Sequence, residues 1–188
     1  MRALADGSTS LMTVDDSYPP IKRDAWHQMD DEAYRETWDR FYALYKFDPS
    51  RGLTEPVIED PQPSVTFDLS GLGPAATRSA STDAINAEAL RYFVSVLSDV
   101  DELFVLDWQH TAYRFRPSIE ALDLAPRDPV NGYPSVYPDG DYYAFLTPNL
   151  REGTFGHPWE SSLCVIGERL VNTLGTTLGT WLPIKRSR

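Results

Sequence analysis

The amino-acid sequence predicts an α+β fold: a single domain with one mostly antiparallel or mixed sheet and helices packed on one side of it. Two observations lead to this class. Apolar side chains recur at helical spacing near residues 30–45, 82–98 and 168–178, and short alternating or apolar runs typical of strands lie between these segments. A length of 188 residues suits one domain with its own core.

The first half of the chain predicts two helices with a strand between them. Four aromatic rings follow one another at i, i+4, i+7 and i+11: Tyr34, Trp38, Phe41 and Tyr45. Acidic residues 30–32 precede this stripe, at the end of a helix where the macrodipole favours negative charge. Residues 65–69 alternate with period two and predict a strand. A loop over residues 71–81 and a capped helix over residues 82–98 are expected next.

The second half predicts further strands. The apolar run 103–106 indicates a central strand, and residues 113–116 are expected to pair with it as a hairpin. A proline-rich loop covers residues 117–134, a turn follows at residues 138–141, and residues 142–146 predict another strand.

The last part of the domain is harder to assign. Gly153 and Gly156 are expected to bracket an irregular stretch. Residues 163–166 are either a strand or the start of a helix, and residues 168–178 predict a last helix. We expect a flexible leader over residues 1–25, the domain over residues 26–182, and a loose basic tail over residues 183–188.

Composition excludes several classes of partner. The net charge is −11, whereas direct binding to nucleic acid or to an anionic membrane needs a basic face. No apolar run reaches the roughly 20 residues of a membrane helix, and no export signal is evident, so we expect a cytoplasmic protein. Cys164 is the only cysteine, which rules out an intramolecular disulfide, and its apolar neighbours predict a buried, inert thiol.

The first candidate site residues follow the predicted central strand. Asp107, Trp108 and His110 lie at its end, where a rigid backbone meets solvent. A histidine paired with a carboxylate can act as a general acid or base near neutral pH. A hydrogen-bonded structural histidine in a hairpin turn is the alternative.

The second group lies in the turn at residues 138–141. Asp139, Asp141 and Tyr142 are its candidate binding residues. The Asp-Gly-Asp turn resembles a calcium loop, but the twelfth position counted from Asp139 is Leu150, which cannot bind a cation. We therefore expect these aspartates to bond nearby backbone amides.

The third group is His157, Trp159 and Glu160. Pro158 keeps His157 out of helical geometry, and Gly156 lets the backbone turn. Stiff aromatic side chains flanked by glycine suit a binding edge, although a demanding turn over a buried tryptophan would also explain them. The histidines and cysteine show no metal-binding spacing, so we expect no metal and no other cofactor.

Several of these motifs resemble a known family. They are Trp38 with Phe41, Asp107-Trp-Gln-His110, Tyr113-Arg-Phe-Arg-Pro117, Pro138-Asp-Gly-Asp-Tyr-Tyr143 and Gly153-Thr-Phe-Gly-His-Pro-Trp-Glu160. Over about residues 26–175 the chain resembles the bacterial domain of unknown function 2716 family, which implies no catalytic residues. The segment Gly140-Asp-Tyr-Tyr-Ala-Phe145 is also similar to SMI1/KNR4 (SUKH)-type immunity proteins, which are acidic α+β modules.

Three functions are compatible with these features. We expect first an acidic protein-binding module, immunity-like, that neutralises a basic toxin, because acidic surfaces steer basic partners and aromatic residues anchor interfaces. The second is a hydrolase-type enzyme with His110, His157 and Glu160 as catalytic candidates, completed by Asp107 and Asp141. The third is a structural accessory domain whose motifs shape difficult turns.

Overall fold

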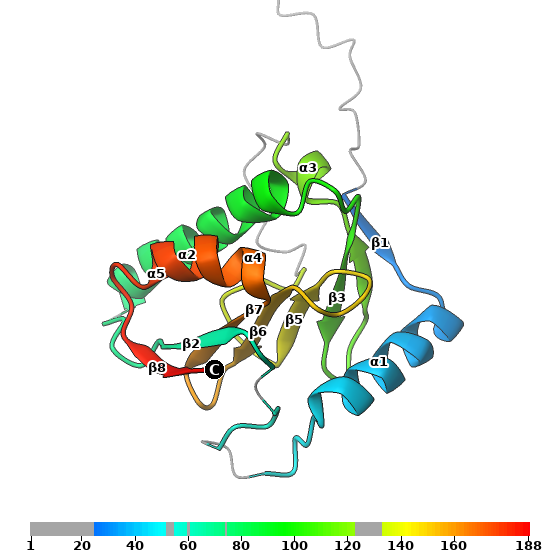
Figure 1. The fold of residues 1–188 in the computed structure, drawn as a ribbon, viewed down its shortest axis with the longest axis horizontal. Coiled ribbons are helices and arrows are strands. Elements are labelled where there is room, and N and C mark those ends of the chain that lie inside the picture. Colours follow the sequence, from blue (N-terminus) through cyan, green and yellow to red (C-terminus); the bar gives the residue numbers. More distant parts are fainter. Residues whose placement is uncertain (1–24, 52–54, 60, 74, 123–132) are drawn as a thin grey trace, which may run out of the picture.

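The computed structural model describes residues 25–51, 55–59, 61–73, 75–122 and 133–188. They form one sheet of eight antiparallel strands in the order β1-β4-β3-β5-β6-β7-β2-β8 (Figure 1). The strands are β1 Trp26–Gln28, β2 Ser64–Asp68, β3 Leu103–Asp107, β4 Tyr113–Phe115, β5 Tyr143–Leu146, β6 Gly153–His157, β7 Ser162–Ile166 and β8 Ile184–Ser187. The α+β class and the single antiparallel sheet are thus confirmed.

Helices cover both faces of this sheet, which corrects the expectation that they pack on one side. They are α1 Asp31–Tyr45, α2 Ala75–Val96, α3 Pro117–Glu120, and a continuous C-terminal helix made of α4 Glu168–Leu170, the π-helical turn η1 Val171–Gly175 and α5 Thr176–Leu178. In Figure 1, α2 and the C-terminal helix run along one side of the sheet, and α1 lies apart from them. None of the described helices has the length and apolar character that crossing a membrane requires.

Alternation along the central strands explains why two cores exist. In β3, Leu103 and Val105 join the cluster under α2 and the C-terminal helix, whereas Phe104 and Leu106 join the cluster under α1. Successive side chains of a strand point to opposite faces, so a strand that is apolar at every position is covered on both sides.

Helix α1 forms as its sequence predicts. The side chain of Asp30 accepts hydrogen bonds from the backbone N–H groups of Glu32 and Ala33, at 3.1 and 2.8 Å, and caps the helix. Trp38, Phe41 and Tyr45 are buried in the second core cluster, so the aromatic stripe is part of the core, as predicted.

Four local predictions need correction or completion. Helix α2 begins at Ala75, inside the predicted loop 71–81. The stretch bracketed by Gly153 and Gly156 is not irregular but forms β6, and residues 163–166 belong to strand β7. The C-terminal tail is not loose: Ile184–Ser187 forms β8 and pairs with β2 at the sheet edge. Apart from Ala25, the predicted leader lies outside the described residues, as do residues 123–132 of the proline-rich loop.

Candidate functional site

The candidate residues gather at one end of the sheet because their strands end there in register. Asp107, the last residue of β3, pairs with Tyr143 of β5, and Tyr143 pairs with Gly156 of β6. Next to it, His157 of β6 pairs with Ser162 of β7. The turns that follow β3, precede β5 and join β6 to β7 therefore share this end of the sheet.

A tight turn brings His110 back toward Asp107. The backbone N–H of His110 donates to the carbonyl of Asp107 at 3.1 Å, and Gln109 has a φ of 63°, as the third residue of a type II turn does. The His110 ring Nδ1 then lies 3.0 Å from Oδ1 of Asp107. His110 is exposed and Asp107 half-buried.

The turn before β5, at residues 138–141, adds a second carboxylate to the Asp107–His110 pair. Oδ2 of Asp141 lies 3.7 Å from the same Nδ1 of His110, while Oδ1 of Asp141 accepts a hydrogen bond from the N–H of Tyr142 at 2.7 Å. That bond to a nearby amide is what the sequence predicts for this aspartate. Asp107, His110 and Asp141 thus form one group, which we call the Asp-His-Asp cluster.

The charges of the cluster affect one another. Burial raises the pKa of Asp107, while the hydrogen bond from His110 opposes the rise and the nearby Asp141 and Asp139 add to it. The hydrogen bond to Asp107 and its charge raise the pKa of His110. Within the described part of the chain, His110 is the one basic side chain at ion-pair distance from Asp107 or Asp141.

A close approach between Gly156 and Pro138 holds the acidic turn against the sheet. A Cβ atom on Gly156 would lie 2.8 Å from Cβ of Pro138, closer than carbon atoms pack. Gly156 is therefore needed for this contact rather than for a turn in its own backbone. Pro138 is buried, and Asp139 and Asp141 follow it directly.

An aromatic group surrounds Tyr142, which is buried. Its ring lies 4.8 Å from the ring of Trp159, 4.9 Å from that of His157 and 5.5 Å from that of Trp108. Because Tyr142 follows Asp141 in the chain, this aromatic group adjoins the Asp-His-Asp cluster. Trp159 retains 40% of its surface exposed.

His157 occupies a structural position. It is 2% exposed, its Nδ1 accepts a hydrogen bond from the N–H of Glu160 at 3.1 Å, and its Nε2 lies 3.0 Å from the carbonyl of Glu55. A carbonyl only accepts, so Nε2 carries the proton and the ring is neutral. Burial lowers the pKa of His157 accordingly.

Glu160 is buried in an ion pair with the C-terminal strand. Its carboxylate binds Arg186 at 2.5 and 3.1 Å and accepts a hydrogen bond from Ser162 at 2.6 Å. Burial alone would raise the pKa of Glu160, but the hydrogen bonds from Arg186 and Ser162 lower it below its ordinary value. The sequence alone assigns no partner to Glu160. The basic residues among positions 185–188 are the signal in the sequence that could have suggested one.

The nine predicted site residues therefore fall into two sets. Asp107, His110, Asp139 and Asp141 form an acidic group that reaches the surface. Trp108, Tyr142, His157, Trp159 and Glu160 form an aromatic group with a buried ion pair beneath it. The two histidines lie at the same end of the sheet, but no hydrogen bond or shared carboxylate joins them in the described residues.

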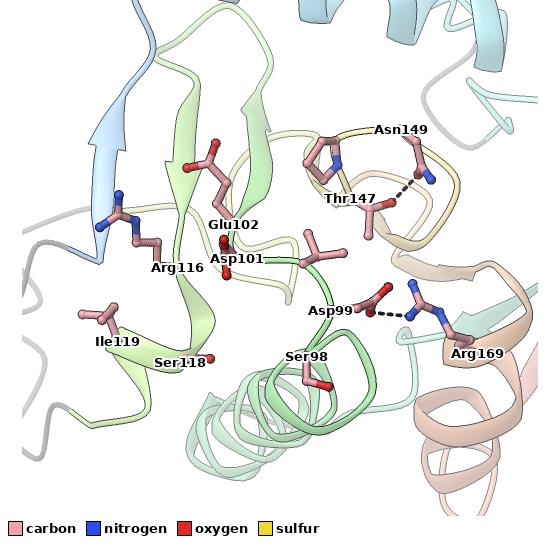
Figure 2. Close-up of a pocket in the computed structure, with 12 residues that line it drawn as sticks. Ser98, Asp99, Asp101, Glu102, Arg116, Ser118, Ile119, Thr147, Asn149 and Arg169 are labelled. Carbon is pink, nitrogen blue, oxygen red and sulfur yellow. Dashed lines mark hydrogen bonds and ion pairs between the residues drawn. The ribbon is translucent and has the colours of Figure 1, made fainter.

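A polar cleft of about 800 Å³ lies at the opposite end of β3 and includes none of these residues. Figure 2 shows that Asp99 points toward Arg169 at its edge and that Thr147 bonds Asn149. Arg169 also contacts Glu152, at 3.4 Å. The Asp99–Arg169 pair joins the segment after α2 to the C-terminal helix, and Glu152 connects the same arginine to the turn between β5 and β6.

The fold and the site define a small acidic α+β protein with one open antiparallel sheet and a carboxylate-rich sheet end. The chain belongs to the family described as "Protein of unknown function (DUF2716)", which matches residues 28–171, so the resemblance found in the motifs is confirmed. It is similar to the uncharacterized protein YxiI of Bacillus subtilis (strain 168), with 26% identity over 156 residues, 79% of this chain and 91% of the relative. No solved structure matches the chain.

Proposed function

We propose that this protein is an acidic binding module that recognises a basic protein, and that it neutralises such a partner in the manner of an immunity protein. The observation that carries the proposal is the gathering of Asp107, Asp139 and Asp141 at one sheet end. His110 lies at ion-pair distance from Asp107 and Asp141, and Trp159, which is 40% exposed, lies on the adjoining aromatic group. The short similarity to SUKH-type immunity proteins points in the same direction.

Electrostatics give this surface its role. Carboxylates that are partly withdrawn from water and repel one another are stabilised when a lysine or arginine approaches, and the pKa of Asp107 is raised by that burial and by Asp141 and Asp139. The net charge of −11 adds a long-range attraction that speeds the encounter with a basic protein.

Trp159 supplies the apolar part of the surface. Its ring packs on Tyr142 and His157, at 4.8 and 6.3 Å, so it loses little freedom on binding. Rigid aromatic side chains beside charged groups are frequent anchors of protein interfaces. Trp159 and the Asp-His-Asp cluster meet at Tyr142, which suits a partner that presents a basic side chain beside an apolar pocket.

The hydrolase alternative has less support. Its catalytic set requires His110, His157 and Glu160 to act together, but both ring nitrogens of His157 are engaged by Glu160 and Glu55, and the carboxylate of Glu160 is engaged by Arg186 and Ser162. The accessory-domain alternative explains the Gly156–Pro138 contact but assigns no role to the Asp-His-Asp cluster.

Binding to basic proteins encoded beside this gene tests the proposal. Each purified protein is passed over immobilised wild-type protein in the presence of EDTA, at low and at physiological salt. We expect one of them to bind with an affinity that falls as salt rises. The double variant Asp139→Asn with Asp141→Asn should slow association roughly tenfold at low salt, and Trp159→Ala should weaken binding by about 2 kcal/mol, or roughly 30-fold in Kd.

Matched variants elsewhere on the surface serve as controls. The pair Asp83→Asn with Asp101→Asn removes the same charge from other exposed positions, and Trp181→Ala removes a tryptophan that is 41% exposed. Equal effects of the control and the site variants would show that total charge, and not this surface, drives binding. Absence of any basic partner would remove the proposed function itself.

A further inference from the structure

We propose that Asp107, His110 and Asp141 form a binding site for a divalent transition-metal ion, for which Zn²⁺ is the first probe. This goes beyond the proposed function and does not depend on it. One ligand atom from each residue, a ring nitrogen and two carboxylate oxygens, lies within 4.8 Å of the other two. Among the described residues, these three are the one group of histidine, cysteine or acidic side chains whose ligand atoms lie this close together.

The distances within the cluster fit a metal polyhedron. Nδ1 of His110 lies 3.0 Å from Oδ1 of Asp107 and 3.7 Å from Oδ2 of Asp141. In a tetrahedral zinc site with bonds of about 2.1 Å, neighbouring ligand atoms are about 3.4 Å apart. The two observed separations fall on either side of this value, and the two carboxylate oxygens lie within 4.8 Å of each other, so rotation of the side chains would bring all three ligand atoms onto one ion.

The backbone directs all three ligands toward one point. The turn at Gln109, with its φ of 63°, returns His110 to Asp107, and the bond from the N–H of Tyr142 to Oδ1 of Asp141 leaves Oδ2 facing His110. The two carboxylates are 16% and 18% exposed, and the imidazole is 63% exposed. An ion can thus enter from the solvent side and meet ligands that are already held in place.

The ligand set determines which ions suit the site. One imidazole and two carboxylates combine a nitrogen ligand that favours Zn²⁺, Fe²⁺ and Ni²⁺ with oxygen ligands that also accept Mn²⁺. Mg²⁺ and Ca²⁺ prefer shells made of oxygen. Three protein ligands leave at least one position open, as in catalytic zinc sites, and this position is available to water or to a side chain of a bound protein.

Calorimetry on metal-free protein tests the site directly. The full chain is stripped with EDTA, exchanged into buffer at neutral pH and titrated with ZnCl₂, with no protein partner present. We expect one saturable site per chain. The variants His110→Ala and Asp107→Asn each remove a ligand. They should weaken Zn²⁺ binding by more than roughly 10–100-fold, which is the loss of affinity when a residue that only supports a metal ligand is mutated. Co²⁺, added to the same protein, should give visible absorption bands that these variants lose.

Two further variants separate this site from general acidity and from the proposed function. Asp83→Asn removes an exposed charge elsewhere, and Asp139→Asn removes a neighbouring charge without removing a ligand, so both should keep the Zn²⁺ site. Weak, non-saturating uptake by wild type, or an unchanged site in both ligand variants that circular dichroism shows to be folded, would overturn the proposal. Partner binding, measured in EDTA, would be unaffected by that result.

Discussion

Arg186 binds the buried carboxylate of Glu160 through both terminal nitrogens of its guanidinium, with Nη1 2.5 Å from Oε1 and Nη2 3.1 Å from Oε2. Lys185 adds a bond from Nζ to the carbonyl of Glu160 at 3.1 Å. Among the described strands, β8 pairs with β2 alone, and β2 separates it from β7. The ion pair therefore reaches across β2 and ties the outermost strand to the turn between β6 and β7.

Replacing Arg186 by Met should destabilise the protein, because Glu160 would keep its buried charge and lose both hydrogen bonds from Arg186. The longer ion pair with Lys185, whose Nζ lies 3.6 Å from Oε1, would remain. A fully buried pair broken on one side costs about 3–5 kcal/mol, and we expect about 2–3 kcal/mol here because 21% of the Arg186 side chain is exposed. Urea unfolding measures the change. The control Arg188→Met, two residues along and exposed, should be nearly neutral, and adding Glu160→Gln to Arg186→Met should restore part of the loss.

The same pair predicts how stability depends on pH. The folded-state pKa of Glu160 is below its ordinary value, so the unfolded chain takes up a proton first as pH falls. The stability that the pair contributes is complete above the unfolded pKa of about 4.3 and is lost as pH falls through the lower folded pKa. Urea midpoints measured from neutral to acid pH should drop more steeply for wild type than for Glu160→Gln. Parallel curves would contradict this assignment.

His157 should remain neutral below the pH at which an ordinary histidine charges. Burial lowers its pKa, and its two hydrogen bonds require the tautomer with the proton on Nε2. Nitrogen-15 NMR of the ring should show this tautomer and a titration midpoint below about 6.5. Exposed His110, whose pKa is raised by Asp107, should titrate above that value in the same spectra and serves as the internal comparison.

Local patterns in the sequence predict much of the fold. Three elements depend on neighbours in the chain or on simple burial: the aromatic stripe of α1, the hairpin of β3 with β4 and the apolar run of β7. Their patterns can therefore be recognised in the sequence. Strand β8 is different. Two of its four residues, Lys185 and Arg186, are basic, and the strand is mostly exposed, as suits an edge strand. Its place is fixed by pairing with β2, more than a hundred residues earlier.

The candidate site divides in the same way. Strand ends and turn residues correctly indicate that Asp107, His110 and Asp141 lie near the surface, since short turns hold them. Sequence cannot show that His157 is bonded to Glu55, 102 residues away, or that Glu160 faces Arg186. Both bonds depend on long-range packing, and they engage the polar atoms of two residues that the sequence offers as catalytic candidates.

Gly156 should be intolerant of even one added methyl group. Gly156→Ala would place Cβ 2.8 Å from Cβ of Pro138, and the strand and the turn would have to separate, at a cost of roughly 1–3 kcal/mol. Thermal unfolding measures the loss. Gly71→Ala is the control, because no atom lies within 4 Å of its added Cβ, and it should leave the melting temperature nearly unchanged.

Because Pro138 positions Asp141, Gly156→Ala should also weaken Zn²⁺ binding at the Asp-His-Asp cluster. A variant as stable as wild type would show that Pro138 moves freely, and that the acidic turn is held by Asp141 and its bond to Tyr142 instead.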